Sequence, residues 1–340
     1  MAMERENQFI GESGAFLDAV EQAGRAAPLE RPVLVIGERG TGKELIAERL
    51  HRLSQRWDGP LITLNCAALP ETLIEAELFG HEAGAFTGAT KARAGAFEES
   101  DGGTLFLDEL ATLSAAAQER LLRAVEYGEV TRIGSNHPQK VDVRIVAATN
   151  ENLPALVDRG TFRADLLDRL SFEVVTLPPL RAREGDILIL ADYFGRRMAV
   201  ELDWPEWPGF GEEATAVMES HRWPGNVREL RNAVERAVYR WDPARGPVDL
   251  IQLDPFESPW RPRSTKPKAA QEAPANAAEP AAAEPEPETD DFKAAVENYE
   301  RRLLETALEK ARYNQRLTAK SLNLSYDQLR HALKRHDLIG

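Results

Sequence analysis

The sequence contains little cysteine, no long apolar run and no overall excess of basic residues. Its single cysteine, Cys66, excludes an internal disulfide and a metal site of four thiolates, and it suits a reducing compartment. No apolar run approaches the ~18 residues that a bilayer-spanning helix requires. The polar first residues lack the apolar core of a secretory signal. We therefore expect a cytoplasmic protein.

The chain is acidic as a whole but basic at its C-terminal end. The formal net charge of −14 argues against nucleic-acid binding by the chain as a whole, because phosphates require local positive potential. From Arg312 to Gly340, however, six basic side chains stand against two acidic ones. Any contact with DNA is therefore expected at the C-terminal end.

One segment divides the chain. Residues 255–290 include eight prolines, nine alanines and six glutamates, a composition with too little apolar surface to offset the entropy of ordering. We predict a semi-extended linker here. The predicted domains are an α/β core (1–178), a helical subdomain (179–254), the linker (255–290) and an all-α tail (291–340).

Before the linker, short apolar runs alternate with helical patterns, which indicates an α/β fold: a parallel sheet with helices on both faces. The predicted strands are Val33–Ile36, Leu61–Asn65, Thr104–Leu107, Val143–Thr149 and Phe172–Leu177. After Pro178-Pro179 the patterns are helical only, over Asp186–Glu201, Glu212–Ser220 and Asn226–Trp241. In the tail, apolar spacing predicts a helix over Phe292–Arg312. Two short helices are expected after it, Gln315–Leu322 and Tyr326–Arg335, the second opened by a capping-box pattern of Ser325 and Gln328.

A glycine-rich segment, Gly37-Glu-Arg-Gly-Thr-Gly-Lys43, follows the first predicted strand and precedes a helical pattern. This is the context of a P-loop, whose backbone N–H groups bind phosphate oxygens while its lysine reaches the terminal phosphates. A plain glycine-rich turn is the alternative, and the flanking strand and helix argue against it. The expected nucleotide-binding residues are Gly37, Glu38, Arg39, Gly40, Thr41, Gly42, Lys43 and Glu44, where Glu44 replaces the Ser or Thr that usually meets Mg2+.

Polar residues end three other predicted strands, at the edge where ligands bind in open α/β sheets. Asp108 is suited to hold Mg2+, and Glu109 to activate or orient the water that attacks ATP. Thr149 with Asn150, and Asn65, end two further strands. Strands often end in polar loops, so each signal is weak alone. Together with the P-loop they predict ATP hydrolysis.

The hexapeptide Gly84-Ala-Phe-Thr-Gly-Ala89 is the most specific of several family motifs in the chain. The others are Gly37–Glu44, Leu64–Ala67, Glu77–His81, Phe162–Leu170 and Trp223–Leu230. On these motifs the chain resembles the AAA+ activators of sigma-54 RNA polymerase, also called bacterial enhancer-binding proteins. The resemblance covers nearly all of residues 7–250 and implies an AAA+ P-loop core with a helical lid. The tail is similar to the Fis-type helix-turn-helix common in this family.

The resemblance implies roles for individual residues. The sigma-54 contacts would be Gly84, Ala85, Phe86, Thr87, Gly88 and Ala89, with Arg132–Gln139 moving beside them. The remaining matches are Arg163 and Arg169 to arginine fingers, Arg228 to the sensor arginine of the lid, and Asn65 to a switch residue that holds Glu109 inactive. Glu44 is normal in this family, whereas Arg39 replaces its usual Ser. From the residues alone, a covered Phe86 ring and an Asp165–Arg169 helical ion pair are the alternatives.

The chain begins almost directly at the ATPase core, an arrangement most like that of the phage-shock members of the family. Such members are held inactive in trans by a partner protein. Trp57 stands between Arg56 and Asp58 in an expected loop and is a candidate anchor for such a partner. A Trp packed against the edge of the core is an equal alternative.

The tail is expected to bind double-stranded DNA at upstream sites. The recognition-helix candidates are Tyr326, Asp327, Arg330, His331 and Lys334, and the phosphate-binding candidates are Arg316 and Lys320. A solvated basic helix end is the alternative. The helix Phe292–Arg312 is expected to pair two tails, which would match palindromic half-sites.

The predicted function is ATP-driven activation of transcription. ATP would bind between subunits of a ring, for which six is the family expectation, and hydrolysis would move the Phe86 loop against sigma-54 to open the promoter. Two alternatives are an AAA+ unfoldase with a DNA-binding tail and a helix-turn-helix repressor whose P-loop only senses nucleotide. The acids Asp108 and Glu109 weigh against the repressor.

Overall fold

The computed structural model describes residues 9–258, 260, 292–310, 314–322, 324, 326–336 and 338. The chain separates into two units, Met1–Arg261 and Pro262–Gly340, which are described one at a time. Most of the predicted linker lies outside the described residues. Within the described ranges, no helix combines the length and apolarity needed to cross a membrane.

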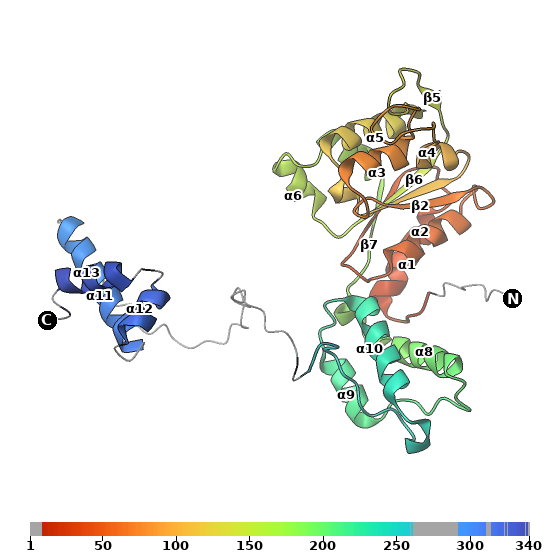
Figure 1. Ribbon diagram of the computed structural model, residues 1–340. Helices are drawn as coiled ribbons and strands as arrows, with labels where there is room; N and C mark the ends of the chain where they lie inside the picture. Colours follow the sequence, from red (N-terminus) through yellow and green to blue (C-terminus); the bar gives the residue numbers. More distant parts are fainter. Residues whose placement is uncertain are drawn as a thin grey trace. The chain divides into compact units, whose positions relative to one another are not determined.

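The first unit is built on a sheet of five parallel strands in the order β2-β3-β6-β1-β7. Figure 1 shows helices such as α2 and α3 packed around this sheet. The strands are β1 (Val33–Ile36), β2 (Leu61–Asn65), β3 (Thr104–Asp108), β6 (Arg144–Thr149) and β7 (Glu173–Thr176). All five predicted strands are present; β7 is shorter than predicted and excludes Phe172 and Leu177. Because the strands are parallel, the carboxyl ends of β2, β3, β6 and β1 follow one another along one edge of the sheet.

Alternate residues of each strand point to opposite faces of the sheet, and helices bury both faces. Leu105 and Leu107 of β3 pack with helices α3 to α7 on one face, while Phe106 packs with α1 and α2 on the other. These helices are α1 (Gly14–Ala26), α2 (Lys43–Arg52), α3 (Glu71–Phe79), α4 (Ala96–Glu99), α5 (Ala115–Tyr127), α6 (Leu153–Asp158) and α7 (Ala164–Leu170). The predicted α/β fold is confirmed.

The helical subdomain after β7 has its own core. Its helices are α8 (Asp186–Glu201), α9 (Glu212–Ser220) and α10 (Asn226–Arg240), with 3-10 turns η2 (Leu180–Ala182) and η3 (Pro243–Arg245). Trp223 is fully buried in that core, and its ring N–H donates to the carbonyl oxygen of Met218 at 2.8 Å. Trp241, predicted as the last residue of α10, has extended backbone instead, and its ring N–H donates to the Gly246 carbonyl oxygen.

A small hairpin was not predicted. Strands β4 (Glu129–Val130) and β5 (Gln139–Lys140) pair antiparallel, and the predicted moving segment Arg132–Gln139 spans most of their connection and ends on the first residue of β5. Strands of two residues are too short for an alternating pattern to appear in the sequence.

The second unit consists of three helices, α11 (Phe292–Lys310), α12 (Gln315–Ser321) and α13 (Tyr326–Arg335). Their buried core is small and apolar, formed by Leu304, Leu308, Ala319, Leu329 and Leu333. All three helices were predicted from the sequence. The end of the first predicted helix, beyond Lys310, lies outside the described residues.

One buried ion pair joins the N-terminal segment to the start of α8. The side chains of Arg183 and Asp186 are almost completely buried, with Nε and Oδ2 2.7 Å apart. Asp186 also accepts hydrogen bonds from the backbone N–H groups of Glu12 and Ser13, and Arg183 donates to the Ile10 carbonyl oxygen. Burial by itself raises the pKa of Asp186, yet these donors together hold the pKa below its ordinary value. The N-terminal segment is therefore fixed against the lid.

Replacing Asp186 with alanine should lower the free energy of unfolding of the first unit by ~3–5 kcal/mol, because Arg183 would become a buried charge without its partner. Urea unfolding measures this loss. The control is Glu21→Ala, which removes a fully solvated pair with Arg25 and should cost no more than ~0.5 kcal/mol. Equal losses in the two variants would contradict the assignment.

Candidate functional site

The P-loop lies at the carboxyl end of β1 and leads into α2. Lys43 is 8% exposed, and its Nζ donates to the carbonyl oxygen of Gly37 at 3.0 Å. Burial lowers the pKa of Lys43, and the nearby carboxylates of Asp108 and Glu109 oppose that shift. An ammonium group that is buried beside two carboxylates is suited to bind the negative charge of a triphosphate. Glu44 is exposed in the first turn of α2.

The register of the sheet places Asn65 directly opposite Asp108. The Asn65 Nδ2 lies 3.5 Å from Asp108 Oδ2, while Asn65 Oδ1 accepts a hydrogen bond from the backbone N–H of Ala67. The sequence prediction paired Asn65 with Glu109; in the structure the amide faces Asp108 instead. The reason is geometric, because Asp108 is the last residue of β3 and Glu109 already turns away from the strand.

Glu109 has a left-handed backbone, with φ 53°. A non-glycine residue adopts this conformation only at a cost, and such residues concentrate at functional sites. Its backbone N–H donates to Asp108 Oδ1 at 2.9 Å, and its carboxylate lies 3.7 Å from the Arg39 guanidinium. Arg39 is 72% exposed at its side chain, so this ion pair is weak and can open easily.

The carboxyl end of β6 adjoins the P-loop. Thr149 pairs with Ile36 across β6 and β1, and its carbonyl oxygen accepts a hydrogen bond from the Gly37 N–H at 3.2 Å. Thr149 is fully buried and Asn150 follows it at the sheet edge. The fold therefore brings Asn65, Asp108, Glu109, Thr149 and the P-loop to one edge, as the sequence predicted.

The lid touches the P-loop through Asn226. This residue is fully buried with φ 52°, and its Nδ2 donates to Glu38 Oε2 at 3.1 Å and to the Arg39 carbonyl oxygen at 3.0 Å. Its Oδ1 accepts from the Leu180 N–H at 2.8 Å. Hydrogen bonds from Arg181 and then Asn226 lower the pKa of Glu38 to about 2. Glu38 therefore stays ionised and fastens the loop to the lid.

A pocket of about 280 Å3 lies between the P-loop and the lid. Its walls are the P-loop residues Gly40, Thr41 and Gly42 together with an apolar and basic set from other segments: Phe9, Ile10, Phe16, Leu45, Arg183, Leu190, Tyr193, Phe194, Arg197, Val227, Arg228 and Arg231. Arg228 was predicted here. Phe9, Ile10 and Arg197 were not, because nothing in the sequence pairs the first residues with helices almost 200 positions later.

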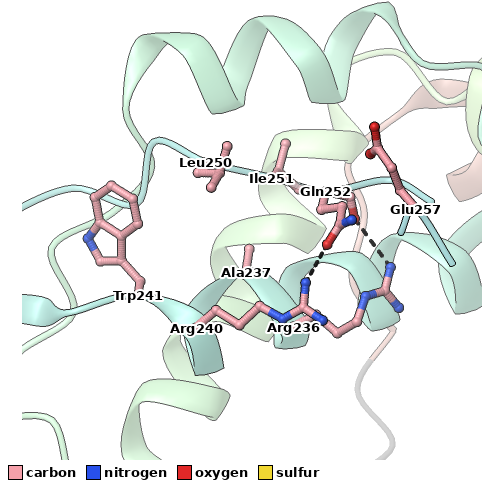
Figure 2. A pocket seen from close by; sticks show the side chains of 8 residues that line it. All are labelled: Arg236, Ala237, Arg240, Trp241, Leu250, Ile251, Gln252 and Glu257. Carbon is pink, nitrogen blue, oxygen red and sulfur yellow. Dashed lines mark hydrogen bonds between the residues drawn. The ribbon is translucent and has the colours of Figure 1, made fainter. Parts of the chain in front are cut away.

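A larger pocket of about 410 Å3 lies elsewhere on the helical subdomain (Figure 2). Its sides are Arg236, Arg240 and Trp241 on α10 or just after it, and residues 250–252 with Glu257. Arg240 donates to the side chain of Gln252 and Arg236 to its carbonyl oxygen, and Figure 2 shows both guanidinium groups turned toward Gln252. No P-loop residue and no acidic residue of β3 lines it. Of these two pockets, only the smaller is lined by residues of the phosphate-binding loop, so it is the candidate nucleotide pocket.

The hexapeptide forms a loop between α3 and α4 whose tip carries one aromatic ring. Phe86 is 37% exposed, and its ring meets the edge of the His81 ring with centroids 5.0 Å apart. Gly84 and Gly88 have φ values of 81° and 102°, which other residues rarely adopt, so the loop needs glycine at both positions. The ring is neither buried nor fully free.

The predicted second segment does lie beside this loop. The Ile133 N–H donates to the Gly80 carbonyl oxygen, and the Glu82 N–H donates to the Ile133 carbonyl oxygen, both at 2.9 Å. Arg132 binds both Glu98 and Glu82 through its guanidinium. Its hydrogen bonds lower the pKa of Glu98. The two segments are therefore tied together at their bases.

The two candidate arginine fingers project from α7 and the residue before it. Arg163 pairs with Asp165 and Arg169 pairs with Glu126, each at 2.7 Å, and both guanidinium groups are substantially exposed. The alternative of an Asp165–Arg169 ion pair is therefore wrong, because Asp165 turns back to Arg163. Neither arginine lines the nucleotide pocket of its own chain.

Trp57 is 67% exposed, so the alternative of a Trp packed against the edge of the core is wrong. Its neighbour Arg56 is anchored, donating to the side chain of Glu30 and, at 2.7 Å each, to the carbonyl oxygen and carboxylate of Asp142. The turn is thus fixed by Arg56 while the indole of Trp57 stands in solvent.

In the second unit, α13 exposes Tyr326, Arg330, His331 and Lys334. Arg335 on the same helix instead pairs with Glu300 of α11. Three other candidates lie on helices, Arg316 and Lys320 on α12 and Asp327 on α13, but their side chains are outside the described set.

Comparison with protein families divides the chain into three matches. Residues 9–176 match the sigma-54 interaction domain, residues 181–272 the AAA+ ATPase lid domain, and residues 295–336 the bacterial regulatory proteins of the Fis family.

Individual relatives agree with these matches. The Psp operon transcriptional activator of Escherichia coli K12 is 51% identical over 335 residues, covering 98% of this chain and 99% of that protein. The transcriptional regulatory protein ZraR of Salmonella typhimurium is 52% identical over 229 residues, which are 67% of this chain and 52% of ZraR. The crystal structure of NtrX from Brucella abortus in complex with ATP is 32% identical with a TM-score of 0.67, over 97% of this chain and 70% of that one.

Lys43→Ala should weaken ATP binding by roughly 10–100-fold, because a buried cation that contacts phosphate contributes ~1.5–3 kcal/mol. Arg39→Ser removes an exposed cation from the same loop and should change ATP affinity by less than about fivefold. Titration with a fluorescent ATP analogue compares the two variants with the unmodified protein. A loss in Arg39→Ser as large as in Lys43→Ala would contradict the geometry.

Proposed function

Because this chain belongs to the family of AAA+ activators of sigma-54 RNA polymerase, as its motifs predicted, we propose that it opens promoters by moving its Phe86 loop against sigma-54. The chain is a sigma-54-dependent activator with an ATPase domain and a helix-turn-helix. The observation that carries the proposal is the exposed Phe86 ring on a loop whose base is tied to Arg132, in a domain whose sheet edge brings Asp108 and Glu109 beside the P-loop.

At that ATP site, each predicted residue has a chemical task. Lys43 would bind the terminal phosphates, and Arg228 would report their presence to the lid. Asp108 offers carboxylate oxygens, the donors that Mg2+ prefers, and magnesium would neutralise charge on the transferred phosphoryl group. Glu109 would orient the attacking water once its contact with Arg39 opens. Asn65 beside Asp108 is suited to sense that change.

Hydrolysis would require a ring, with six subunits as the family expectation. Arg163 and Arg169 are exposed and lie outside their own nucleotide pocket. An arginine delivered by a neighbouring subunit stabilises transition-state charge and can raise the rate by orders of magnitude. Their partners Asp165 and Glu126 would hold these side chains until a neighbour offers a phosphate.

The tail would select the promoter. The four exposed residues of α13 are suited to the major groove, and Arg316 and Lys320 of α12 to phosphates. Pairing of two α11 helices would match a palindromic site. Binding upstream would raise the local concentration of the ring near the polymerase. Since its partner is chromosomal DNA, we expect the protein to act in the cytoplasm.

The controlled genes would be a phage-shock operon, because the full-length relative described above is the activator of the Psp operon. An inhibitory protein in trans would then bind the ATPase domain. Trp57 is suited to anchor it, being an aromatic ring exposed on a turn that Arg56 keeps rigid. An inhibitor that acts this way would slow ATP turnover of the unmodified protein and leave Trp57→Ala uninhibited.

Phe86→Ala should abolish promoter opening by purified sigma-54 polymerase while ATP turnover without polymerase stays near that of the unmodified protein. Loss of an aromatic anchor costs ~2 kcal/mol or more, about 30-fold in affinity. Opening by Phe86→Ala as efficient as by the unmodified protein would sink the proposal. ATP-dependent unfolding of varied proteins without sigma-54 would favour the unfoldase alternative.

Arg330→Ala should reduce affinity for the upstream site by ~1–3 kcal/mol, and Lys334→Ala should lower the slope of log affinity against log salt by about one. The matched control is Arg335→Ala, on the same helix, whose guanidinium is occupied by Glu300. Gel-shift titrations at several salt concentrations measure all three. If Arg335→Ala weakens binding as much as Arg330→Ala, the recognition surface is misassigned.

A further inference from the structure

Gln118 is a fully buried polar residue on α5 that joins three segments of the core. Its Oε1 accepts a hydrogen bond from the backbone N–H of Arg163 at 2.9 Å. Its Nε2 donates to the carbonyl oxygens of Leu113 at 2.8 Å and of Thr161 at 3.2 Å. Both polar atoms of the side chain therefore have backbone partners inside the protein.

These partners fix the orientation of the amide and select glutamine. A backbone N–H requires an acceptor and two carbonyl oxygens require donors, so Oε1 and Nε2 cannot be exchanged. Glutamate would place a buried negative charge against the Leu113 and Thr161 carbonyl oxygens. Methionine, of similar size, would remove all three hydrogen bonds. The side chain is thus chosen for its chemistry as well as its volume.

One side of this network leads to the turn of the catalytic-type acid Glu109. Thr112 donates to the Glu109 carbonyl oxygen from its N–H at 3.0 Å and from its hydroxyl at 2.8 Å. The Leu113 N–H donates to the Leu110 carbonyl oxygen at 3.2 Å, and Leu110 is completely buried. Leu113 therefore ends a short, packed turn that begins at Glu109, and Gln118 holds its carbonyl.

The other side leads to Arg163. This residue precedes α7 with extended backbone, φ −79° and ψ 129°, and its N–H is held by Gln118. The same amide also holds Thr161, two residues earlier. The backbone is therefore fixed on the core, whereas the guanidinium is exposed and pairs with Asp165, two residues later. That arrangement suits an arginine that must reach out from a defined position.

We infer that Gln118 is a positioning residue that sets the place of Arg163 relative to the Glu109 turn of the same subunit. The position of an Arg163 side chain that reaches the ATP of the neighbouring subunit would then depend on the Glu109 turn of its own subunit. The inference rests on the proposed role of Arg163 at the ATP site of a neighbouring subunit. It adds a connection within one subunit, through Gln118, between the Glu109 turn and Arg163. Gln118 itself touches neither P-loop nor nucleotide pocket.

The first test is ATP turnover by Gln118→Met. The kcat should fall by roughly 10–100-fold, the scale of an ~1 Å misplacement of a catalytic group. The KM and the affinity for a fluorescent ATP analogue should stay within about twofold, because the variant's own pocket is intact. An unchanged kcat, or a loss of nucleotide affinity as large as the loss of kcat, would overturn the inference.

The second test mixes subunits. Glu109→Gln keeps Arg163 correctly placed but cannot hydrolyse, so rings that mix it with Gln118→Met should recover turnover at the Gln118→Met sites. Arg163→Ala mixed with Glu109→Gln is the reference and should recover in the same way. Gln118→Met mixed with Arg163→Ala should not recover, because neither subunit delivers a placed arginine.

The subunit mixtures distinguish a wrong role for Gln118 from a wrong role for Arg163. Recovery with Arg163→Ala but not with Gln118→Met would overturn the role of Gln118 and leave the trans arginine standing. No recovery in either mixture would contradict the trans arginine itself, and with it the inference. If Gln118→Met fails to fold, Gln118→Asn and Gln118→Glu replace it in both tests. Unfolding of all three would make Gln118 a structural residue and overturn the inference.

Discussion

Asn226 is the side chain on which the geometry of the nucleotide pocket depends. It is buried in a left-handed conformation that asparagine tolerates better than most residues. From that position it binds Glu38, the Arg39 carbonyl and the Leu180 N–H at once. The lid thereby approaches so closely that a Cβ on Gly40 would lie 2.3 Å from the Gly225 carbonyl oxygen. Arg228, two residues later, lines the same pocket as Gly40, Thr41 and Gly42.

Two other hydrogen-bonded connections join distant segments of the first unit. Glu109 and the turn after it reach Gln118 and hence Arg163, which faces outward. The Phe86 loop is bound to the 132–134 segment, and Arg132 binds Glu98 at the end of α4. Both connections rest on buried or half-buried hydrogen bonds in a closely packed core. Under the proposed function, small shifts in this core would move the Phe86 loop and Arg163.

The sequence predicted the strands and helices well, because their apolar patterns are local. Five strands, the lid helices and the three tail helices agree with the predicted ranges to within a few residues. What it missed are contacts between distant segments: Arg183 with Ile10, Arg39 with Glu109, and Asn65 with Asp108. The β4–β5 hairpin escaped because two-residue strands carry no periodic signal. The alternative of an Asp165–Arg169 ion pair was wrong because the spacing of two residues on a helix permits a contact without requiring it.

The sequence by itself determined the chemistry of this protein. Local spacing was enough to identify four features, because each consists of residues that are close together in the sequence. They are the P-loop, the paired acids, the glycine-flanked Phe86 and the basic end of the tail. Tertiary structure alone decided their relations: which carboxylate Asn65 faces, that Trp57 is exposed while Arg56 is pinned, and that Gln118 joins the Glu109 turn to Arg163. The physical reason is that strand order, register and burial arise from packing segments far apart in the chain, and no local pattern records those distances.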